Sequence, residues 1–161
     1  MSSSGDRGLP KARAKVTRML LFRPPARAPL QQLLDHYVEF FRTVGSPGFP
    51  TPEAIVRERL DIGLRRSYHP AGVARQLLAI AAAGDRSFAL RKISRPTLVI
   101  HGDSDPFVRV AHGIDCARKI PGATLKIVPG MGHDLAPGLV PILCESLLGH
   151  LRASDSARRS G

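Results

Sequence analysis

The chain has 161 residues, of which 43% are hydrophobic, and its formal net charge is +11 at pH 7. The length suits one globular domain. No apolar run approaches the about 18 residues of a membrane-spanning helix, and the start lacks the apolar core of a signal peptide, so we expect a cytoplasmic protein with no membrane partner. The basic residues are spread along the chain without aromatic interleaving or zinc-finger spacing. We therefore expect a solvated basic surface and consider a nucleic-acid partner disfavoured.

The first half of the chain has the pattern of a block of helices. Residues 1–10 are rich in Ser, Gly and Pro and predict a loop. Apolar residues at three- and four-residue spacing then predict three helices over 12–22, 30–44 and 73–83. A further helix over 52–66 is predicted from Thr51 as a candidate N-cap and Pro52 at the first helical position. Asp85 or Ser87 is a candidate cap for a short last turn. The second of these helices, over 30–44, is the clearest, because its apolar residues recur regularly on one face. That apolar face must be buried against another element.

After residue 93 the pattern alternates between strand and helix. Residues 97–100 and 125–128 are short apolar runs rich in β-branched residues and bounded by Gly and Pro. Such runs predict two buried parallel strands. A crossover helix is expected over 108–119 and a last helix over 139–151, while the polar tail 153–161 predicts disorder.

Two cysteines, Cys116 and Cys144, fall within helical patterns. We expect small buried side chains in a reducing compartment rather than a disulfide framework, although the sequence leaves a single pair open.

Each predicted strand is followed by a polar loop. Asp103 and Asp105 follow the first strand, and His133 follows the second. Parallel strands place their C-terminal ends at one edge of the sheet, so a carboxylate and an imidazole are expected to meet there, as an acid that orients a base. Asp103 is the rival acid, but an Asp after Gly more often stabilises its own turn. His101, at a strand end, is interpreted as a structural histidine.

The remaining histidines fall on helices or at a helix break, without a partner at metal-ligand spacing: His36, His69, His112 and His150. We interpret them as structural or exposed, and we expect neither a metal nor a cofactor. Tyr68 and the pair Phe40 and Phe41 are candidates for lining a pocket, but their helical spacing favours core packing.

Two strands do not form a stable sheet by themselves. A continuous apolar strand normally has hydrogen-bonded neighbours on both sides and helices on both faces. We therefore expect that the chain is part of something larger or finds its missing strands in another molecule.

Several segments resemble a known family. The run H-G-D-S-D-P-F-V from His101 and the run I-P-G-A-T-L-K-I-V-P-G-M-G-H-D-L from Ile120 resemble the C-terminal portion of α/β-hydrolases. Upstream, G-S-P-G-F-P, R-S-Y-H-P-A-G-V-A-R-Q-L-L-A-I and A-G-D-R-S-F-A-L-R are similar to the cap and return segment of bacterial esterases of the aclacinomycin methylesterase-like group. The resemblance covers nearly the whole chain but only the second half of the family's length.

The resemblance implies an α/β class and a partial α/β-hydrolase fold: a helical cap over 11–92, followed by two parallel strands with a crossover and C-terminal helices over 93–152. It implies ester hydrolysis of the Ser-His-Asp type. Asp105, in the G-x-x-D spacing from Gly102, matches the catalytic acid, and His133, in G-M-G-H, matches the base.

The chain departs from the family in lacking a nucleophile motif. No G-x-S-x-G occurs, and G-S-P-G at Gly45 lacks the strand, turn and helix context of a nucleophile elbow. The loop that forms the oxyanion hole is absent as well, and Arg109 stands where related loops usually have proline. We therefore expect a truncated or split enzyme that is inactive alone.

The alternative is a non-catalytic basic interaction module derived from a hydrolase. The expected partners are a small ester for the complete enzyme, and either a complementary N-terminal chain or a second copy for the open sheet.

Overall fold

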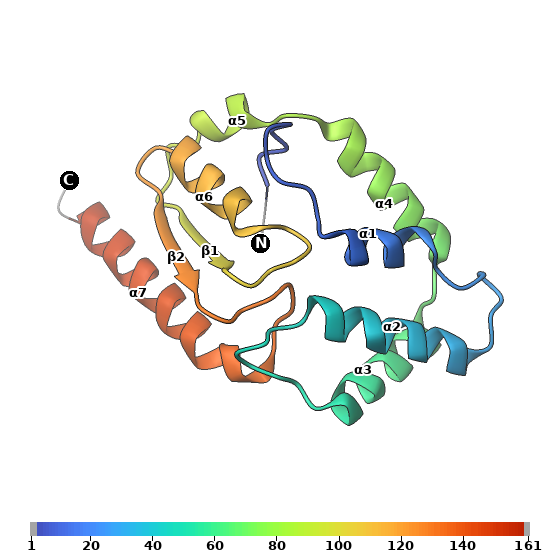
Figure 1. Cartoon of the computed structure of the whole chain (residues 1–161). Helices are drawn as coiled ribbons and strands as arrows, with labels where there is room; N and C mark the ends of the chain where they lie inside the picture. Colours follow the sequence, from blue (N-terminus) through green and yellow to red (C-terminus); the bar gives the residue numbers. More distant parts are fainter. Residues whose placement is uncertain (1–2, 160–161) are drawn as a thin grey trace.

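A computed structural model describes residues 3–159 and places a helical block beside a small α/β unit (Figure 1). The helical block contains five helices: α1 (Ala14–Leu21), α2 (Leu30–Val44), α3 (Glu53–Arg66), α4 (Pro70–Ala83) and α5 (Ser87–Arg91). No strand occurs in the described chain before Leu98. The predicted helices are therefore confirmed, with small shifts at their ends.

The helix α4 begins at Pro70, three residues before the predicted start. Proline lacks a backbone N–H, but the first turn of a helix leaves its N–H groups unpaired anyway, so proline is favoured at this position. Pro70 is therefore the first residue of α4.

The α/β unit contains two parallel strands, β1 (Leu98–Gly102) and β2 (Thr124–Val128). Leu98 pairs with Thr124 and Gly102 with Val128, so the two strands end level with each other. The crossover helix α6 (Val110–Lys119) and the last helix α7 (Val140–Arg159) lie on opposite sides of the strands (Figure 1).

The strand β2 is less buried than its apolar sequence predicts. Val128 is buried, but the side chains of Thr124, Leu125 and Lys126 are exposed. The described chain supplies two strands only, so each strand keeps one unpaired edge. The prediction of a buried second strand is wrong for Leu125 and Lys126, because nothing in the described chain covers their side chains.

The helix α7 continues past the predicted end at Leu151. Residues 153–159, for which the sequence predicts disorder, are helical, while residues 160–161 of that tail lie outside the described residues. No Gly or Pro occurs between 150 and 159 to stop the helix, and the Ser154 hydroxyl donates a hydrogen bond to the carbonyl of His150 at 2.8 Å. None of the described helices is long and apolar enough to cross a membrane.

The apolar face of α7 is largely uncovered. Leu147 is 49% exposed and Leu151 is 57% exposed. Cys144 is exposed too, which makes the prediction of a buried Cys144 wrong, whereas Cys116 on α6 is buried as predicted. Helical spacing identifies which residues share a face, but it does not show that a partner for that face is present.

One buried hydrophobic cluster lies at the loop that follows β2. It contains four buried residues, with Phe49 and Ile142 packed against them: Val128, Met131, Ala136 and Leu139. This cluster packs against the loop that carries His133 and holds it in position.

Candidate active site

Asp105 and His133 meet at the C-terminal edge of the two strands. Asp105 is almost completely buried, and its Oδ2 accepts a hydrogen bond from Nδ1 of His133 at 2.8 Å. Its Oδ1 accepts the backbone N–H groups of Phe107 and Val108, both at 2.8 Å. A carboxylate of this kind is an acceptor only, so Nδ1 of His133 carries the proton. The other ring nitrogen, Nε2, makes no hydrogen bond within the described chain.

Asp105 is ionised in this environment. Burial alone raises the pKa of the Asp105 carboxyl. The hydrogen bond and charge of His133 and the two backbone N–H groups oppose burial, and together they hold this pKa below its ordinary value. The carboxylate therefore fixes the tautomer of His133 and can stabilise an imidazolium.

The loop of His133 is attached to the end of α2. The backbone N–H of His133 donates to the carbonyl of Val44 at 2.7 Å, and the N–H of Gly132 donates to Oγ of the buried Ser46 at 2.9 Å. The Ser46 hydroxyl in turn donates to the Asp134 carboxylate. A Cβ on Gly132 would lie 2.2 Å from the carbonyl oxygen of Gly45, so only glycine allows this approach.

The two alternative candidates, Asp103 and His101, form hydrogen bonds that hold the loops in place. Asp103 accepts the N–H of Gly130 and the hydroxyl of Ser104, each at 2.8 Å, and so joins the two loops. The buried His101 donates from Nε2 to the carbonyl of Val108 at 2.7 Å. Burial is the main cause that lowers the pKa of His101, so its ring is neutral. The interpretation of His101 as structural agrees with these contacts. Asp103 bonds within its own turn, as the sequence suggested, but it also bonds to the loop after β2.

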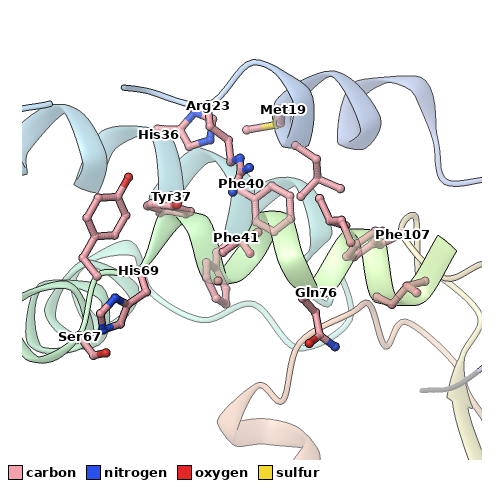
Figure 2. Close-up of a pocket in the computed structure, with 16 residues that line it drawn as sticks. Met19, Arg23, His36, Tyr37, Phe40, Phe41, Ser67, His69, Gln76 and Phe107 are labelled. Carbon is pink, nitrogen blue, oxygen red and sulfur yellow. The ribbon is translucent and has the colours of Figure 1, made fainter. Parts of the chain in front are cut away.

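A cavity of about 630 Å³ lies beside this pair, between the helices of the first half and the loop after β1 (Figure 2). Phe107 joins the two regions, because its ring centroid lies 4.7 Å from that of His133 and 6.3 Å from that of Phe40. The cavity wall includes Phe40, Phe41 and Tyr68. The prediction that these three side chains pack in the core is therefore wrong, since periodicity identifies an inward face without showing whether that face meets side chains or a cavity.

The other four histidines lie in three places: His36 and His69 line the cavity, His112 lies on α6 and His150 lies on α7. Nε2 of His112 donates a hydrogen bond to the carbonyl of Pro10 at 2.9 Å, and its Nδ1 forms a hydrogen bond of 2.6 Å with Oγ of Ser3. These bonds attach the N-terminal segment to α6. Within residues 3–159, no group of three or more His, Cys, Asp or Glu side chains is arranged to hold a metal ion.

Comparisons with known proteins show which proteins this chain is similar to. No protein-family model matches the sequence. The rhodomycin D methylesterase DauP of Streptomyces sp. strain C5 is 29% identical over 150 residues, which cover 91% of this chain and 49% of the relative. The chain thus spans about half the length of the curated relatives it matches.

Among solved structures, the meta-cleavage product hydrolase of Pseudomonas fluorescens IP01 superimposes with a TM-score of 0.71 at 11% identity, covering 94% of this chain and 53% of that one. This chain carries part of an α/β-hydrolase fold. An esterase from Exiguobacterium antarcticum matches the same partial hydrolase fold with a TM-score of 0.63 at 17% identity, covering 86% of this chain and 47% of its own. The resemblance to esterases of the hydrolase superfamily is confirmed.

Proposed function

We propose that the chain supplies the acid and the base of a carboxylic-ester hydrolase. The observation that carries this proposal is the buried Asp105 carboxylate bonded to Nδ1 of His133, which leaves Nε2 of the same ring without a partner in the described chain. A base oriented in this way can accept a proton from a serine hydroxyl.

In the proposed reaction, Nε2 of His133 takes the proton of a serine hydroxyl while the serine oxygen attacks the ester carbonyl carbon. The tetrahedral intermediate collapses, the bond to the alcohol oxygen breaks, and His133 returns the proton to the leaving alkoxide. Water then attacks the acyl-serine by the same proton transfers, releasing the acid and restoring the serine. Throughout, Asp105 holds the ring and stabilises its positive charge.

The nucleophile in this proposal belongs to a segment outside the 161 residues. The sequence contains no G-x-S-x-G, and the chain spans about half of its methylesterase relative. Each strand of the two-stranded sheet has an unpaired edge, and further strands of the complete hydrolase would pair there. On this account the chain alone is inactive, and helices α1–α4 form the cap over the substrate.

A chimera tests the proposal. This chain would replace the matching region of DauP, and hydrolysis of p-nitrophenyl acetate would be followed together with the circular dichroism of the product. We expect measurable turnover that falls by about 10³-fold or more in His133→Gln and Asp105→Asn chimeras. A folded chimera whose activity does not depend on His133 would refute the assigned role.

A second candidate, a non-catalytic interaction module, is favoured by one observation. Leu147, Leu148 and Leu151 expose apolar side chains along α7, beside an open sheet. On this account the chain self-associates through that face. Sedimentation velocity separates the two candidates: a dimer that Leu147→Glu and Leu151→Glu convert to a monomer favours the module, whereas a monomer in the unaltered chain counts against it.

A further inference from the structure

The cavity beside the Asp105–His133 pair contains an uncompensated positive charge. Arg23 follows the end of α1 and lines the cavity. Its Nη1 atom is fully buried and makes no hydrogen bond. No carboxylate forms an ion pair with Arg23 within residues 3–159. By contrast, Arg42 pairs with Glu53, and Arg57 pairs with Asp35 and Glu53.

The polar neighbours of Arg23 do not supply a negative charge. Figure 2 shows the Arg23 side chain among His36, Tyr37 and Phe40. Burial, followed by the neighbouring Tyr68, raises the pKa of Tyr37, although the charge of Arg23 and a hydrogen bond between Arg23 and Tyr37 oppose this rise, so the phenol is neutral at pH 7. Burial, followed by the charge of Arg23, lowers the pKa of His36, so its imidazole is neutral too. Arg23 is only partly buried as a whole, but its Nη1 donor is buried without an acceptor. Such a donor is costly, and a bound anion would remove that cost.

Most of the remaining cavity wall is apolar, although Ser67, His69 and Gln76 also line it. Its wall includes aliphatic and aromatic side chains from several elements: Met19, Leu20, Phe40, Val73, Leu77, Ile80 and Phe107. The volume of about 630 Å³ falls in the range of pockets that enclose small organic ligands. An apolar cavity with one charged group favours a ligand that is mostly hydrophobic and carries one opposite charge at a fixed position.

We propose that this cavity binds an apolar, preferably aromatic, molecule that carries a carboxylate, and that Arg23 binds the carboxylate. The inference rests on the proposed function, because Phe107 lies between the cavity and His133 and would direct such a substrate toward the base. The ester would then be one group of the substrate and the carboxylate another. Arg23 is thus assigned as a specificity-determining residue.

Two fluorescent probes of similar shape test this assignment: 1-pyrenebutyrate, which carries a carboxylate, and 1-pyrenebutanol, which is neutral. Their affinities for the full chain would be measured by fluorescence anisotropy at pH 7. We expect the carboxylate probe to bind about tenfold more tightly than the alcohol, as one charge-assisted hydrogen bond provides. The preference should persist at about 1 M salt, where attraction to exposed basic residues is screened.

Three variants locate the effect. Arg23→Met should weaken pyrenebutyrate binding about tenfold and leave pyrenebutanol binding unchanged, and Arg23→Lys should retain part of the preference because it keeps the charge. The matched control is Arg27→Met, since Arg27 is exposed four residues further along and does not line the cavity. It should change neither affinity.

Equal affinity of the two probes for the unaltered chain would overturn the proposal, whether or not any variant folds. An equal effect of Arg23→Met and Arg27→Met would overturn it as well. The assay needs neither a nucleophile nor turnover. A failure here would leave the role of His133 intact, whereas an inactive chimera with an intact probe preference would refute the esterase proposal alone.

Discussion

The carboxylate of Asp105 and the imidazole of His133 are 28 residues apart in sequence and joined by a hydrogen bond of 2.8 Å. Their position follows from the fold, because β1 and β2 are parallel and end level with each other, so the loops after them leave the sheet side by side. The same carboxylate also accepts two backbone N–H groups of its own loop. It is therefore a structural anchor as well as the partner of His133.

Acid pH should lower the free energy of unfolding, because it protonates the Asp105 carboxylate. The pKa of Asp105 is lower in the folded chain than the ordinary value of about 3.9, so its ionised form stabilises the fold. This contribution is complete above about pH 4 and is lost as the pH falls through the lower, folded pKa. Asp105→Asn should cost about 1–3 kcal/mol of unfolding free energy at pH 7 and progressively less at acid pH, as measured by urea denaturation.

The control for this measurement is Asp155→Asn, because Asp155 is exposed on α7. It should change the unfolding free energy by less than about 0.5 kcal/mol at every pH. A cost of Asp105→Asn that stays constant down to pH 3 would show that ionisation of Asp105 does not stabilise the fold.

Ser46 should matter for stability through two contacts that its sequence motif does not reveal. Its hydroxyl is buried, donates to Asp134 and accepts the N–H of Gly132, so Ser46→Ala leaves a buried donor and a carboxylate without a partner. We expect a loss of about 1–3 kcal/mol in thermal or urea unfolding. Ser94→Ala, at an exposed position, should be close to neutral, and equal effects of the two substitutions would contradict the assigned contact.

Two glycines should respond to alanine in opposite directions. A Cβ on Gly102 would lie 2.0 Å from the carbonyl oxygen of Met131, so Gly102→Ala must displace the His133 loop and should cost several kcal/mol. Gly63 lies within α3 with nothing within 4 Å of the added atom, so Gly63→Ala should stabilise the chain by about 0.5–1 kcal/mol. Thermal unfolding of both variants checks the pair. A tolerated Gly102→Ala would mean that the two loops do not approach as described.

The chain alone should not react as a serine esterase. Treatment with a fluorophosphonate probe should label no serine, and p-nitrophenyl acetate should give no burst, because the proposed nucleophile lies outside these residues. Mass spectrometry of the treated chain reads the labelling. A labelled serine in this polypeptide would contradict the assignment of the nucleophile to another segment.

The sequence was sufficient for the parts of the fold that depend on local pattern. Both strands, the crossover helix and the polar loops follow from short apolar runs bounded by Gly and Pro, and the meeting of Asp105 with His133 follows from the parallel arrangement. The contacts of Ser46 and Gly132 could not be predicted, since they join residues 86 positions apart and depend on how α2 packs on the loop.

The dependence on distant parts of the chain also explains why the predicted burial of Cys144 and Phe40 was wrong. Spacing assigned each residue to the apolar face of a helix, but burial depends on what covers that face. Nothing described covers Cys144, and a cavity lies beside Phe40. Arg23 has no sequence signal, because one arginine after a basic helix resembles the many exposed arginines of this chain.

The most direct test of the account is the protonation of the His133 ring, read from long-range proton–nitrogen correlation spectra of the ¹⁵N-labelled chain at neutral pH. We expect Nδ1 to carry the proton and Nε2 to be bare, and we expect Asp105→Asn to abolish this fixed tautomer, with spectra of His150 as the internal control. A His133 ring protonated at Nε2 alone, or one that Asp105→Asn leaves unchanged, would contradict the claim that Asp105 orients His133 as a base.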